Sequence, residues 1–151
     1  MTDRRGAPAL SLCCELASRL EEVDSVCQRV RAFLQANGRA ADGFAVELLA
    51  REALNNAILH GNENQSQKNA RLSLHLGRRW LRLQVTDEGA GFNWRAARHS
   101  SAAADEIHGR GLSIGALYAD RMAYNQRGNQ VTFWLALSGT AKRHQHGKLH
   151  A

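Results

Sequence analysis

The sequence lacks long apolar runs and regularly spaced cysteines, and it has a single proline. A helix needs about 20 apolar residues to span a bilayer, and no stretch approaches that length. Near the N-terminus, Glu15 interrupts the apolar residues before a signal-peptide core can form. Cys13, Cys14 and Cys27 are odd in number and form no CxxC pair, which indicates neither a disulfide framework nor a zinc site. We therefore expect a cytoplasmic protein with reduced thiols and no membrane partner.

Two common nucleotide-binding signatures are also missing. No segment matches GxxxxGK followed by Ser or Thr, which excludes a P-loop. The glycines Gly109, Gly111 and Gly115 have the wrong last spacing for a dinucleotide fingerprint, and no predicted strand precedes them. A Rossmann domain is therefore not expected either.

The net charge of +6 raises the question of nucleic acid. Part of the excess lies in a C-terminal segment, and the other basic residues match no helix-turn-helix or zinc finger. A nucleic-acid-binding regulator would rest on charge alone. We expect a solvated basic surface and no direct contact with nucleic acid.

A chain of 151 residues with 44% apolar residues can bury one good core. Residues 1–8 and 138–151 lack the periodic apolar spacing that packing requires. The sequence predicts a flexible N-terminus at 1–8, a single domain at 9–137 and a flexible basic tail at 138–151.

Apolar spacing within the domain predicts two helices after a first strand. Alternation favours a strand over residues 10–16, and helical spacing then runs from Leu20 to Leu34, with Gly38 ending the helix. A second helix is expected over residues 42–60, with Asp42 as N-cap and Gly61 as a C-terminal stop.

The remainder predicts two hairpins separated by a long loop. Residues 72–76 and 81–85 alternate around a turn, and so do residues 122–126 and 130–137. The polar segment 88–108 is too long for a routine connection and is interpreted as a flexible lid, followed by a helix over 112–120. Grouped helices beside a mainly antiparallel sheet make an α+β two-layer sandwich.

A first polar cluster lies on the second predicted helix. Glu52 and Asn56 are four residues apart, so their side chains share one helix face. An amide oxygen beside phosphates suits magnesium, and a nearby carboxylate can accept a proton from an attacking hydroxyl. Taken alone, this spacing is more often just the polar face of a helix.

A second cluster, Asp87, Gly89 and Gly91, follows the first hairpin. Alternation places Asp87 on the same face as Val85, so its carboxylate needs a donor partner. An adenine amino group is one candidate, and the glycines let the backbone approach a flat base. Alternatively, Asp87 merely ends a strand and the glycines make a turn.

A third cluster opens the next predicted helix at Gly109, Arg110, Gly111 and Leu112. Backbone amides at a glycine-rich helix N-terminus, together with an arginine, suit phosphate oxygens. A glycine hinge that binds no ligand is the simpler alternative.

The order of these clusters carries a resemblance that none of them carries alone. The phrases EALNNAILHG, TDEGAGF and GRGLSIG resemble the histidine-kinase-like (GHKL) ATPase superfamily, and most closely its anti-sigma-factor serine kinases. The likeness covers residues 10–137. It implies the Bergerat ATP-binding fold, an antiparallel sheet with helices on one face, and the cofactors ATP and Mg2+.

The resemblance also implies residue roles. Glu52 would be the general base, Asn56 the magnesium ligand and Asp87 the adenine-binding carboxylate. Gly89 and Gly91 would form the floor of the base pocket, and the phosphate-facing end of the lid would comprise Gly109, Arg110, Gly111 and Leu112.

Family members often hold the base with a threonine near the last strands. Here Asn129 and Gln130 precede Val131, and Thr132 follows it. That contact is therefore an open question at the level of the sequence.

The subfamily implies a protein serine kinase that phosphorylates a STAS-type antagonist and sequesters a sigma factor. A full histidine kinase is not expected because the chain is short for an added dimerisation helix pair. Arg29 would meet the antagonist, and a homodimer is compatible with the resemblance. The alternative is a non-catalytic module in which ATP only orders a protein-binding surface.

Overall fold

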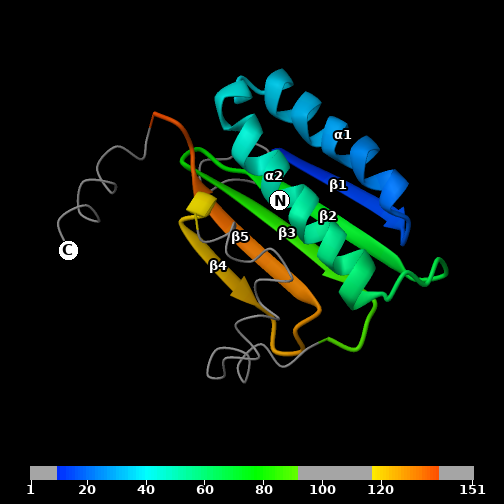
Figure 1. Cartoon of the computed structure of the whole chain (residues 1–151). Helices are drawn as coiled ribbons and strands as arrows, with labels where there is room; N and C mark the ends of the chain where they lie inside the picture. The colour runs from blue at the N-terminus through cyan, green and yellow to red at the C-terminus, as the bar shows by residue number, and fades with distance from the viewer. Residues whose placement is uncertain (1–9, 92–116, 140–151) are drawn as a thin grey trace.

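The described part of the chain folds into a sheet with helices on one face (Figure 1). The computed structural model describes residues 10–91 and 117–139. Its main elements are β1 Leu10–Ala17, α1 Val23–Ala36, α2 Gly43–Asn56, β2 Asn69–Leu76, β3 Trp80–Asp87, β4 Arg121–Tyr124 and β5 Gln130–Ala136. The strand order is β1-β2-β3-β5-β4, and each of these pairings is antiparallel. The expected α+β two-layer fold is confirmed.

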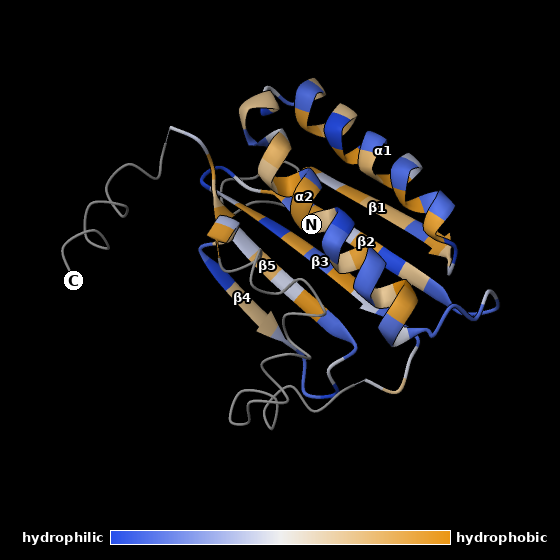
Figure 2. Cartoon of the chain, viewed as in Figure 1, coloured by the Kyte–Doolittle hydropathy of each residue, from blue (hydrophilic) through white to orange (hydrophobic). Residues whose placement is uncertain are grey.

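Buried apolar residues of the sheet and of the two helices form one core cluster, and apolar and polar residues alternate along the strands (Figure 2). In β2 and β3, alternate side chains are buried and their neighbours are more exposed. The register places Leu72 opposite Val85 and Leu74 opposite Leu83. The predicted first hairpin is therefore confirmed, and so is the second, whose alternating residues Val131, Phe133, Leu135 and Leu137 are all buried.

The first helix ends as the sequence indicates. A short 3-10 turn, Leu20–Glu22, leads into α1. Gly38 has a φ of +71°, a left-handed conformation that suits glycine, and the amide of Arg39 donates to the carbonyl of Leu34 at 2.7 Å. The stop at Gly38 is confirmed.

The role expected for Asp42 at the start of α2 is wrong. Its side chain makes no cap hydrogen bond to the helix. Instead, its carboxylate accepts hydrogen bonds from the amide of Ser138 at 3.1 Å and from the hydroxyl of Ser138 at 2.6 Å. Asp42 thus ties the beginning of α2 to the chain that leaves β5, a long-range contact that competes with local capping.

The role expected for Gly61 also needs correction. Beyond Asn56 the chain continues into a π-helical turn, Ala57–Gly61, and Gly61 has no positive φ. A Cβ atom at this position would lie 2.3 Å from Cγ of Asp87. The helical stretch does end at Gly61, close to the predicted end, but glycine is required there because the Asp87 side chain occupies the space.

Several expectations lie outside the described residues. They concern the N-terminus at 1–8, most of the lid at 88–108, the start of the helix at 112–120 and the tail beyond 139. Of that last helix, Leu117 and Tyr118 are helical, whereas Ala119 and Asp120 are not, so the expected end at residue 120 is wrong. No helix within 10–91 and 117–139 combines the length and the apolar character that crossing a membrane requires.

The three thiols are free and differ in their surroundings. Cys13 is exposed, whereas Cys14 and Cys27 are buried. Burial raises the pKa of both buried thiols above its ordinary value. Their packing in the core favours the neutral, unreactive form.

Candidate functional site

A cleft lies between α2 and the half of the sheet that carries β3 and β5. About 480 Å³ of space, part of which is open solvent, lies between its walls. Its apolar lining consists of Leu49, Ala53, Ala57, Val85, Val131 and Phe133. The other lining residues are Glu52, Asn56, Asp87, Tyr124, Gly128, Asn129 and Gln130. Apolar walls with a few polar groups suit a flat, partly polar ligand.

Helix α2 supplies the first pair of predicted residues. Glu52 and Asn56, one turn apart, are both partly buried and both line the cleft. Asn55 is also partly buried, but it is not part of the cleft lining. The four-residue spacing therefore identifies which of the two asparagines faces the cleft.

Asp87 enters the cleft from the end of β3. Its Oδ1 accepts a hydrogen bond from the amide of Gly89 at 2.8 Å. A Cβ atom at Gly89 would lie 2.0 Å from the carbonyl oxygen of Gly61, and one at Gly61 would collide with Asp87 itself. The carboxylate is thus packed between two backbone segments that only glycine allows to come so close.

The hairpin between β4 and β5 closes the other side. Gly91 has a φ of +83°, and a Cβ atom there would lie 1.9 Å from the carbonyl oxygen of Arg127. Nε of Arg127 donates to the carbonyl of Ala90 at 3.5 Å. Gly91 therefore serves the contact between the loop after β3 and the hairpin. Neither Gly89 nor Gly91, the expected floor of the base pocket, is among the described residues that line the cleft.

Thr132, the threonine near the last strands, is not among the described residues that line the cleft. Thr132 pairs with Gln84 in the β3–β5 register and accepts a hydrogen bond from its Nε2 at 3.0 Å. By strand alternation this places Thr132 on the face opposite to that of Val131 and Phe133. Asn129 and Gln130, which precede Val131, both line the cleft. The sequence left the choice among these residues open, because only the turn between β4 and β5 brings Asn129 beside Asp87.

The remaining predicted residues are not part of this cleft as described. Gly109, Arg110, Gly111 and Leu112 lie outside the described residues. Arg29 is exposed on α1, where it makes no ion pair with any described residue. Its proposed contact with a partner is therefore not tested by this geometry.

Comparison with known families identifies the family to which the chain belongs. The model of the histidine kinase-like ATPase domain matches residues 16–135, which include all the described residues of the cleft. No match was found among curated proteins. The chain therefore belongs to the family of histidine kinase-like ATPase domains and is an ATP-binding module of that kind.

Proposed function

We propose that the protein is an anti-sigma-factor serine kinase, which transfers the γ-phosphoryl group of ATP to a serine of a STAS-type antagonist and sequesters a sigma factor. The observation that supports this most is the convergence of Glu52, Asn56 and Asp87 in one cleft. They come from two segments that the sequence separates by a whole strand. The phrase EALNNAILHG adds the resemblance to that subfamily.

At the end of the cleft near Asp87, the adenine ring would be bound. Val85, Val131 and Phe133 offer apolar surface to a flat base, and Asp87 offers a carboxylate beside them. A carboxylate accepts the hydrogen bond that an exocyclic amino group donates. The glycines at positions 61 and 89 let the backbone pack closely around this carboxylate.

At the end of the cleft near Asn56, magnesium would be bound together with the phosphates of ATP. Within the described residues, no group of three or more His, Cys, Asp or Glu side chains is placed to hold a metal ion. The amide oxygen of Asn56 would supply one hard ligand, with phosphate oxygens and waters as the others. Magnesium would neutralise phosphate charge during transfer.

Glu52 would act as general base. Its carboxylate accepts the proton of the serine hydroxyl, the serine oxygen bonds to the γ-phosphorus, and ADP leaves with the bridging oxygen. One helical turn separates Glu52 from Asn56, so the base would stand next to the metal-bound phosphates. General-base assistance is worth about 100-fold to 10,000-fold in rate.

The test is phosphoryl transfer to candidate antagonists, followed by mass spectrometry for phosphoserine. We expect Glu52→Gln to retain ATP binding and to lose transfer by at least about 100-fold. Glu47→Gln is the matched control because Glu47 lies on the same helix and not in the cleft. If Glu52→Gln transfers phosphate at the wild-type rate, Glu52 is not the base.

Wild-type protein that binds ATP but phosphorylates no antagonist would favour the non-catalytic module.

The same proteins test the proposal that Arg29 contacts the antagonist. Arg29→Ala should weaken capture of the antagonist without changing affinity for ATP, because Arg29 is exposed on α1 and absent from the cleft lining. Gln28→Ala, also exposed on α1, is its control.

A further inference from the structure

We propose that Asn129 and Asn62 are positioning residues that hold the Asp87 carboxylate where it selects adenine. The inference rests on the proposed function of the cleft. It follows from two separate sets of hydrogen bonds, one on each side of the chain around Asp87.

Asn129 holds the backbone of Asp87 at two points. The amide of Asp87 donates to the carbonyl of Asn129 at 2.9 Å, and Nδ2 of Asn129 donates to the carbonyl of Asp87 at 3.0 Å. The paired register of β3 and β5 ends one residue earlier, with Thr86 opposite Gln130. The Asn129 side chain therefore extends the sheet contact to the residue that carries the carboxylate.

Asn129 is itself fixed by the turn that contains it. Nδ2 of Asn125 donates to Oδ1 of Asn129 at 2.6 Å. Oδ1 of Asn125 accepts from the amides of Gly128, Asn129 and Gln130 at 2.8, 3.1 and 3.2 Å. With its oxygen occupied by Asn125 and its nitrogen by Asp87, the Asn129 amide has one favourable orientation.

Asn62 holds the next residue from the opposite side. Its side chain is fully buried, and its Oδ1 accepts from the amide of Glu88 at 2.8 Å. Its Nδ2 donates to the hydroxyl of Ser18 at 2.9 Å and to the carbonyl of Asn69 at 3.0 Å. Asn62 follows the π-helical turn, so it fastens the exit of α2 to the segment just after Asp87.

This fastening matters because the carboxylate is closely packed. A Cβ atom at position 61 would have no room beside Asp87, and the amide of Gly89 donates a hydrogen bond to the carboxylate. A small shift of the Asp87 backbone would change the direction in which the carboxylate points. Hydrogen bonds weaken steeply with misalignment, so base selectivity should depend on the two asparagines.

The experiment measures the dissociation constants of Mg-ADP and Mg-GDP for the wild type and Asn129→Ala. We expect ADP binding to weaken about tenfold and GDP binding to change little, so the preference for adenine falls about tenfold. Asn37→Ala is the matched control. It also loses a side-chain hydrogen bond to a backbone carbonyl, that of Phe33, at the end of α1.

The control should lose stability while keeping the adenine preference. Asn62→Ala should behave like Asn129→Ala, and if it does not fold, Asn129→Ala alone decides. An unchanged ADP-to-GDP ratio in Asn129→Ala would overturn the positioning role.

A second readout needs no nucleotide. The amide of Gly89 donates to Asp87, so its hydrogen exchange reports how firmly the carboxylate is held. We expect exchange about tenfold faster in Asn129→Ala than in the wild type or Asn37→Ala. Wild-type protein that binds neither nucleotide would contradict the proposed function, whereas unchanged exchange in Asn129→Ala would contradict the positioning role.

Discussion

The glycines around Asp87 serve the site through contacts between distant segments. The sequence singles out Gly89 because it belongs to a short local phrase, Asp-x-Gly-x-Gly, and its amide bonds to Asp87 two residues away. The need for glycine at position 61 was not predictable in the same way. It depends on the side chain of Asp87, which meets the π-helical turn only in the folded chain. Local patterns thus identify residues whose neighbours are near in sequence and miss the reasons that lie across the fold.

Gly61→Ala should destabilise the protein, whereas Gly43→Ala should stabilise it. The new methyl at position 61 would overlap the Asp87 carboxylate, and overpacking of this kind costs about 1–3 kcal/mol. A Cβ atom at position 43 meets nothing within 4 Å and lies in a helix, where alanine is favoured over glycine by about 0.5–1 kcal/mol. Urea unfolding of both variants measures the difference. Equal stability of the two would contradict the packing around Asp87.

At the scale of elements, apolar periodicity predicts the helices and strands but not their ends. Asp42 has a suitable residue type and position for a cap, yet its carboxylate bonds to Ser138. The sequence of the π-helical turn after Asn56 contains no local signal that distinguishes this turn from an α-helix. The ends of elements are set by tertiary contacts, which single-segment patterns do not contain.

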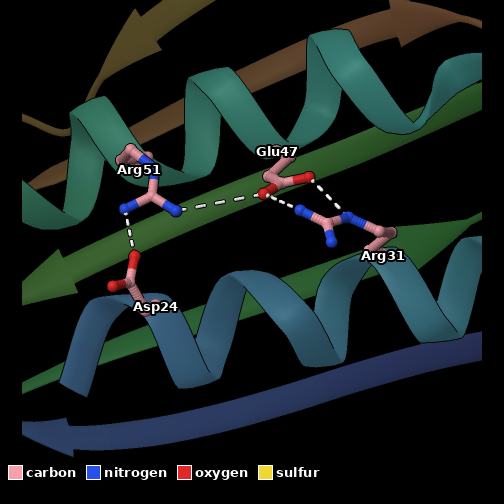
Figure 3. A network of polar contacts seen from close by, with 4 residues as sticks. All are labelled: Asp24, Arg31, Glu47 and Arg51. Carbon is pink, nitrogen blue, oxygen red and sulfur yellow. Dashed lines mark hydrogen bonds and ion pairs between the residues drawn. The ribbon is translucent and has the colours of Figure 1, made fainter.

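The two helices are also linked by a chain of charges on their outer side (Figure 3). Arg31 pairs with Glu47, and Arg51 reaches both Glu47 and Asp24. The hydrogen bond to Asp24 raises the pKa of Arg51 above its ordinary value, so its guanidinium stays charged at neutral pH. Most of these side chains are substantially exposed, which limits what the network adds to stability.

Arg51→Gln should lower the free energy of unfolding by no more than about 1 kcal/mol, and less in high salt. Glu47 keeps Arg31 as its partner in this variant, so no half-buried charge is left alone. Leu54→Ala, on the same helix, removes a fully buried side chain and should cost about 2–5 kcal/mol. Denaturant titration at low and high salt measures both. A loss above about 2 kcal/mol for Arg51→Gln would mean that the ion pairs, and not the core, hold α1 against α2.

At the scale of the whole molecule, the sequence predicts the layers but not the juxtaposition that makes the site. Alternating strands and amphipathic helices in this order imply a two-layer sandwich. That β5 lies beside β3 places the turn before β5 next to the end of β3, and so brings Asn129 to Asp87. This pairing joins segments on either side of residues 92–116 and has no signature in either strand alone.

Nucleotide binding should therefore stabilise the whole domain, because the cleft uses both the helix layer and the sheet layer. A ligand at 100 times its dissociation constant adds about 2.7 kcal/mol to the free energy of unfolding. For a chain of this size, that raises the melting temperature by about 5–10 °C. Asp87→Asn should lose most of this shift, since the base contact exists in the bound ground state, while Glu52→Gln should keep it because a general base acts during transfer.

Differential scanning fluorimetry with Mg-ADP at millimolar concentration measures the shift for the wild type and both variants. Each variant is compared with its own melting temperature without nucleotide, so a change in intrinsic stability does not enter the comparison. A full shift in Asp87→Asn would contradict base recognition by Asp87. A lost shift in Glu52→Gln would give Glu52 a part in binding, and the loss of transfer in that variant would then no longer identify it as the base. The ligand-induced shift and the transfer rate together separate a residue that holds the nucleotide from one that acts on it.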